Sequence, residues 1–131
     1  SIPLGTYVKV DSREALVASG VDERLIDDLF GAAEEFRYSL KLDGTRWSHF
    51  FSVDGSADEL GDLGTYAYDD QGLWVTTSES EGAGGSVLAF EWDFDGEALT
   101  LRVDWDHSSA APEEQRESDS MVLNGVYEKT G

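Results

Sequence analysis

Residues 86–105 carry the pattern that most constrains the fold of this chain. Apolar and aromatic residues occupy every second position on both sides of Asp95-Gly96: Leu88, Phe90, Trp92 and Phe94 before it, and Leu99, Leu101, Val103 and Trp105 after it. Strict alternation on both sides of an Asp-Gly pair is typical of a β-hairpin joined by a tight turn. The stretch therefore predicts a sheet with one aromatic face and one charged face.

The same alternation returns along most of the chain. It predicts further strands over 5–10, 36–42, 46–53, 63–68, 73–77 and 120–129, with polar turns or loops at 79–85 and 107–119. Short meandering strands of this kind form either a closed barrel or a sandwich. Closure removes edge strands and gathers the rings inside. We therefore predict an all-β chain with a short helical insert, built as an eight-stranded antiparallel up-and-down β-barrel.

The insert covers about residues 12–34, between strands one and two. Asp11 followed by Glu14 forms a capping-box pattern for a first helix, and Asp22 can cap a second. The apolar stripe of the second helix needs a surface to bury it. Over the barrel mouth it would act as a lid through Leu25, Leu29 and Phe30, whereas against the wall it would be structural.

Composition limits the class of partner. The 131 residues suffice for a single domain, 1–131, and the net charge of −19 opposes binding to nucleic acid or to anionic membrane surfaces. No stretch approaches the roughly 20 apolar residues of a membrane span, so membrane insertion is not expected. We expect a soluble protein, either cytoplasmic or secreted with its leader removed. The sequence does not predict an oligomeric state.

The aromatic residues of the inner face are the candidate ligand-binding residues. They are joined by one histidine, and the set is Phe36, Tyr38, Trp47, His49, Phe51, Tyr66, Tyr68, Phe90, Trp92 and Trp105. Core packing explains any one of these rings, but so many together are typical of the lining of a small-molecule site. His49 shares the inward face, where it is either a hydrogen-bonded core residue, a polar anchor for a ligand, or a general acid or base.

Two sequence motifs resemble a calcium-binding and a phosphate-binding loop, but neither is complete. Glu91-x-Asp93-x-Asp95-Gly96 matches half of a calcium loop, but Arg102 stands where the bidentate glutamate belongs. The glycines at 82–85 lie between strands, whereas phosphate cradles require a following helix. The chain lacks cysteine, and its two histidines lie far apart in sequence. We predict no metal and no cofactor.

Four motifs give the chain a family resemblance. They are Gly5-Thr6-Tyr7, Asp43-Gly44-x-x-Trp47, Gly64-Thr65-Tyr66, and the run from Phe90 through Trp92 to Leu101. With the helical insert, they resemble lipocalin-like barrels of the calycin type, and most of all the small barrel domains of actinobacterial proteins. The resemblance implies a cup that binds hydrophobic molecules. It also implies a smaller set of relatives that catalyse cyclisations inside the cup.

Three functions stay open at this stage. The first is binding of a hydrophobic small molecule without catalysis. The second is an enzyme of natural-product biosynthesis that cyclises or isomerises a flexible apolar substrate, with His49, Tyr38 or Tyr66 assisting proton transfer. The third is a filled barrel that serves as an accessory domain and binds a protein partner.

Overall fold

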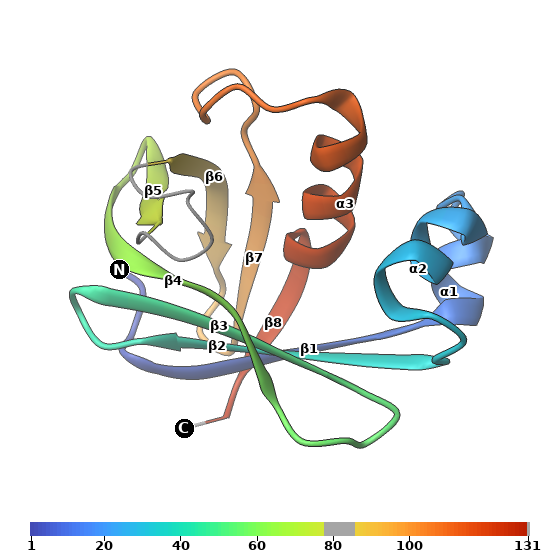
Figure 1. The fold of residues 1–131 in the computed structure, drawn as a ribbon. Coiled ribbons are helices and arrows are strands. Elements are labelled where there is room, and N and C mark those ends of the chain that lie inside the picture. Colours follow the sequence, from blue (N-terminus) through green and yellow to red (C-terminus); the bar gives the residue numbers. More distant parts are fainter. Residues whose placement is uncertain (78–85, 131) are drawn as a thin grey trace.

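The fold is a closed β-barrel with three short helices. A computed structural model describes residues 1–77 and 86–130 of the chain. The elements follow in the order β1 (Gly5–Ser12), α1 (Arg13–Ala18), α2 (Glu23–Phe30), β2 (Glu35–Leu42), β3 (Arg46–Val53), β4 (Glu59–Asp69), β5 (Gly72–Thr77), β6 (Val87–Phe94), β7 (Ala98–Val103), α3 (Glu113–Leu123) and β8 (Gly125–Lys129). Each strand pairs antiparallel with its sequence neighbours, and β8 pairs with β1 to close the barrel (Figure 1). The predicted eight-stranded up-and-down barrel, with a helix pair after the first strand, is confirmed.

The β6–β7 hairpin forms at the predicted turn. Phe94 pairs with Leu99, and the Asp95 carboxylate accepts hydrogen bonds from the backbone N–H groups of Glu97 and Ala98 at 2.9 Å each. A short side chain that bonds backbone two or three residues ahead is the usual reason for Asp in such turns. Local chemistry is therefore enough to set the register of this hairpin.

The inward-facing side chains of the strands make one continuous core. Its largest fully buried members are Trp47, Tyr7, Tyr38, Tyr127, Phe36, Phe90, Ile26, Leu40, Leu73, Leu99, Leu101 and Val75. Burial of each such side chain contributes about 1.5–3 kcal/mol before conformational entropy is subtracted. Six of these twelve side chains are aromatic, because a small barrel has few positions with which to fill its interior.

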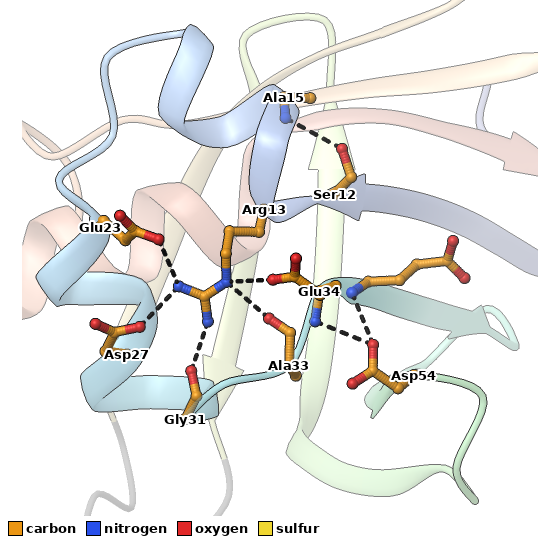
Figure 2. Close-up of polar contacts among 10 residues, drawn as sticks. Ser12, Arg13, Ala15, Glu23, Asp27, Gly31, Ala33, Glu34 and Asp54 are labelled. Carbon is orange, nitrogen blue, oxygen red and sulfur yellow. Dashed lines mark hydrogen bonds and ion pairs between the residues drawn. The ribbon is translucent and has the colours of Figure 1, made fainter.

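Arg13 ties together the two ends of the helical insert and its second helix. Its guanidinium forms ion pairs with Asp27 at 2.7 Å and Glu34 at 2.8 Å, and its Nε donates to the carbonyl of Ala33 at 2.9 Å (Figure 2). The predicted capping box of Asp11 and Glu14 is wrong, because β1 continues to Ser12 and the Ser12 hydroxyl caps α1 instead. The predicted Asp22 cap of α2 is confirmed by its bond from the N–H of Arg24.

The segment before β8 differs from the prediction. The expected loop over 107–119 is right only up to residue 112 and the expected strand over 120–129 only from Gly125, since α3 occupies Glu113–Leu123. The helix is polar almost throughout and buries only Met121 and Leu123, so its apolar residues at the C-terminal end mimic the start of a strand. In Figure 1 α3 stands beside β7, on the same end of the barrel as α1 and α2.

The bounds of two strands also differ from the prediction. β4 begins at Glu59 rather than at residue 63, and Trp105 lies past the end of β7. The expected turn over 79–85, with its glycines at 82–85, lies outside the described residues. Among the described helices, none has the length and apolar character to cross a membrane.

Candidate functional site

A cavity of about 430 Å³ lies between α2, α3 and the barrel interior. We call it the α2–α3 cavity. The described residues that line it are Leu29, Phe30, Tyr38, His49, Phe51, Gly61, Asp62, Thr77, Ser86, Val87, Leu88, Trp105, Ser109, Ala110, Ala111, Gln115, Ser118, Asp119, Val122 and Leu123. They come from α2, from strands β2 to β6 and from the segment that carries α3. The cavity therefore depends on elements spread over most of the sequence.

Aromatic side chains give the cavity its rigid apolar lining. Phe30 of α2 stacks on Phe36 with ring centroids 4.6 Å apart, and its ring also lies 6.1 Å from that of Phe51. Trp105 is held on the opposite side by a 2.9 Å hydrogen bond from its indole N–H to the Ser120 hydroxyl. Rings held in this way offer a ligand apolar surface at little further entropic cost.

Tyr38 and His49 bring polar atoms to the same cavity. The Tyr38 hydroxyl and His49 Nε2 are buried and have no hydrogen-bond partner within the described part of the chain. The two rings stack with centroids 5.7 Å apart, and only 2% of the His49 surface is exposed. A buried polar atom without a partner costs about 1–3 kcal/mol, which a polar molecule in the cavity can recover once the Tyr38 or His49 side chain turns to meet it.

Burial also fixes the charge of this pair. Desolvation, with a smaller contribution from nearby Lys9, lowers the pKa of His49 to about 4, so its imidazole is neutral at pH 7. Desolvation raises the pKa of Tyr38, which therefore stays protonated. The two groups are thus neutral hydrogen-bonding groups rather than charged anchors.

A β-bulge makes room for His49. The pairing of β3 with β4 shifts between His49 and Phe50, where Asp62 lies opposite His49 and Leu60 lies opposite Phe50. Gly61 is the extra residue, and a Cβ there would lie 3.3 Å from His49 Nδ1 and 3.4 Å from the Phe51 ring. Bulges commonly redirect side chains next to functional sites. This one turns Asp62 toward the α2–α3 cavity.

Lys9 lies against the Tyr38 ring and anchors α3. Its ammonium donates to the carbonyls of Asn124 at 2.7 Å and Met121 at 3.3 Å, pairs with Asp11 at 3.1 Å, and lies 4.7 Å from the Tyr38 ring centroid. Cations stabilise the C-terminal end of a helix, where carbonyls lack partners. Desolvation lowers the pKa of Lys9, and Asp11 opposes that shift. This buried contact holds α3 over the barrel end.

Two carboxylates lie at the cavity wall, Asp62 on β4 and Asp119 on α3. Both are half-buried, and desolvation raises the pKa of each. The charge of Asp62 raises the pKa of Asp119 further, whereas a hydrogen bond from Gln115 lowers it. The negative charge of Asp62 therefore makes ionisation of Asp119 less favourable.

The ten predicted ligand-binding residues separate into three groups. Tyr38, His49, Phe51 and Trp105 line the cavity, as do the predicted lid residues Leu29 and Phe30, whereas Leu25 does not. Phe36, Trp47 and Phe90 are buried in the core.

The third group lies toward the opposite end of the barrel, near the hairpin turns. Tyr66 stacks on Tyr68, Trp92 packs edge-on against Tyr68, and the Tyr68 hydroxyl accepts a bond from the N–H of Ile2. The Tyr66 hydroxyl accepts a bond from the N–H of Gly44 in the β2–β3 turn. The N-terminal residues and these rings pack together at that end.

Comparison with known proteins identifies no family. No family model and no curated protein matches the chain. One solved structure, described as a "REP1-NXSQ fatty acid transporter", matches over 98% of this chain and 96% of that chain, with 16% sequence identity and a TM-score of 0.34. The eight-stranded antiparallel barrel is consistent with the lipocalin-like resemblance of the sequence.

Sequence reasoning missed three charged residues of this region. Lys9 shares the inward face of β1 with Tyr7, so strict alternation was the signal that could have found it. Asp62 lies in a stretch that reads as an acidic loop, and the bulge that turns it inward has no clear signature. Asp119 belongs to α3, for which Pro112 followed by Glu113 and Glu114 was the available sign of a helix start.

Proposed function

We propose that this barrel binds a small hydrophobic molecule in the α2–α3 cavity. The observation that carries the proposal is the cavity itself: about 430 Å³, walled by rings, with unpartnered polar atoms on Tyr38 and His49. Binding sites for small molecules are typically concave, largely apolar and about 300–1,000 Å³ in volume, with a few polar groups that orient the ligand. An accessory domain that binds only a protein partner has no need of such a space.

The helices give the site a means of admitting its ligand. Phe30 and Leu29 come from an insert whose parts are joined by the polar contacts of Arg13, and the end of α3 is joined to β1 through Lys9. Leu29 is 43% exposed although it lines the cavity, so part of the rim is open to solvent. We propose that α2 acts as the lid, with Phe30 covering a bound molecule.

A neutral fluorescent dye tests the proposal. N-phenyl-1-naphthylamine brightens in apolar sites, and being uncharged it avoids repulsion or attraction by the acidic surface. We expect saturable binding with one dye per chain. Val122→Trp places an indole in the cavity and should abolish that binding.

The matched control makes the same change elsewhere. Val126 is 53% exposed on β8 and does not line the cavity, so Val126→Trp should bind the dye like the unmodified protein. Circular dichroism melting of both variants separates a blocked cavity from an unfolded barrel. Unchanged dye binding by a folded Val122→Trp protein, or no saturable binding by the unmodified protein, would show that this proposal is wrong.

Catalysis inside the cavity stays a prediction. Of the residues that sequence reasoning gave as acid or base candidates, His49 and Tyr38 line the cavity, whereas Tyr66 lies near the opposite end and bonds to Gly44. No contact in the described part of the chain orients His49 Nε2 toward a reacting group.

A further inference from the structure

The charged side chains that line the α2–α3 cavity, in the described part of the chain, have one sign. Among the described residues that line it, the carboxylates Asp62 and Asp119 are present and Lys and Arg are not. The two acids come from different elements, β4 and α3, so the closed barrel and the docked helix bring them together. Half-buried charges are screened less by salt than exposed ones, so they act strongly on whatever enters the cavity.

The buried cation Lys9 does not itself line the cavity. Lys9 lies against the Tyr38 ring, and its ammonium is already paired with Asp11 and bonded to the carbonyls of Met121 and Asn124. A ligand carboxylate in the cavity would find no positive partner among the described lining residues and would face two like charges. A fatty-acid anion is therefore a poor match for this site.

The unpartnered atoms of Tyr38 and His49 supply an independent reason to expect a ligand with a polar group. Both side chains are at least nine-tenths buried, and both line the cavity. Burial holds both in their neutral forms at pH 7, so they offer hydrogen bonds but no charge to a ligand. The charge preference of the cavity is consequently set by Asp62 and Asp119.

We propose that the cavity selects an apolar amine. The apolar body of the ligand lies against Phe30, Phe51 and Trp105, and its protonated amino group lies beside the carboxylates of Asp62 and Asp119. This inference rests on the proposed function, that the cavity binds a small hydrophobic molecule. It adds the sign of charge that the ligand carries.

Three ligands that differ only in their head group test it. Decylamine, decanol and decanoate are compared at pH 7 by displacement of N-phenyl-1-naphthylamine from the full chain, below the concentration at which they form micelles. A half-buried ion pair changes affinity by about fivefold. We expect decylamine to bind at least about fivefold tighter than decanol, and decanoate to bind more weakly than decanol.

Variants then assign the preference to the two acids. Asp62→Asn and Asp119→Asn should each weaken decylamine by about fivefold while leaving decanol unchanged, because only a charged head group responds to the lost carboxylate. The control is Asp70→Asn combined with Asp93→Asn, two exposed acids outside the cavity lining. It lowers the net negative charge by more than either test variant does, yet it should leave all three affinities unchanged.

The outcomes are distinguishable. If the dye binds but decanoate displaces it as well as decylamine does, the amine inference is overturned and the proposed function stands. If the preference for decylamine falls equally in the control, general attraction to an acidic protein explains it and the inference is again overturned. If the dye does not bind the unmodified protein, the proposed function itself fails. Circular dichroism verifies that each Asn variant is folded, and either single variant suffices for the assignment.

Discussion

His49 should make the free energy of unfolding of this barrel depend on pH, and a single substitution of His49 should remove that dependence. The ring is 2% exposed, and desolvation lowers its pKa from 6.5 to about 4. Between these two pKa values the unfolded chain binds a proton that the folded chain does not bind. Acid therefore favours unfolding, and the stability present above pH 6.5 is lost as the pH falls toward 4.

The magnitude follows from the two pKa values. One pKa unit corresponds to about 1.36 kcal/mol, so the linkage of His49 lowers the free energy of unfolding by about 3 kcal/mol between pH 7 and pH 4. The carboxylates also titrate in this range, and Asp62 and Asp119, whose pKa values are raised, act in the opposite direction. These contributions cancel when the free energy of unfolding of the protein is compared, at each pH, with that of a variant that lacks only the imidazole.

His49→Gln supplies the second protein, because glutamine does not titrate. Urea unfolding at pH 7, 6, 5 and 4 gives the free energy of unfolding of both. Whatever the substitution costs at pH 7, we expect the gap between unmodified protein and variant to change by about 3 kcal/mol in favour of the variant by pH 4. A gap that stays constant over this range would refute the reasoning and would mean that a proton reaches folded His49 as easily as unfolded.

The remaining predictions concern the attachment of the helices. Lys9→Met leaves Asp11 and two carbonyls of the α3 end without their cation, so urea unfolding should show a loss of about 3 kcal/mol. Gly125→Ala should cost about 2 kcal/mol in the same assay, since Gly125 has φ +138° and a Cβ there would lie 2.7 Å from Lys9 Cδ; a neutral result would contradict both the backbone strain and the Lys9 contact. Arg13→Gln should speed amide hydrogen exchange in α2 while the barrel amides stay protected, whereas Arg24→Gln, an exposed arginine of α2, should change neither.

The hairpin turns of the barrel and the pairings that they join were predictable because they depend on neighbours in sequence. Asp95 caps its own turn, and alternation over 88–94 and 99–103 sets both register and face. The helix α3 was not predictable from periodicity, because most of its length is polar and its apolar residues gather at one end. Its stability depends on packing of Met121 and Leu123 and on a lysine more than a hundred positions earlier in the chain.

The candidate site was also predictable only in part. Alternation correctly pointed Tyr38 and His49 into the barrel, but it could not tell which inward rings meet a cavity and which fill the core. Tyr66, Tyr68 and Trp92 have the same pattern as Phe51, yet they lie near the opposite end with the N-terminal residues. Which rings meet open space depends on what covers each end of the barrel.

The sequence by itself determined a series of strands with an aromatic inner face, because a period of two is a local property of each strand, and it favoured their closure into a barrel. Only the tertiary structure decided where that interior stays open and which charges face it. Asp62 faces the cavity at a bulge, and Asp119 lies on α3, whose C-terminal end is bonded to Lys9. Such placements result from contacts between distant segments, and no pattern within one segment encodes them.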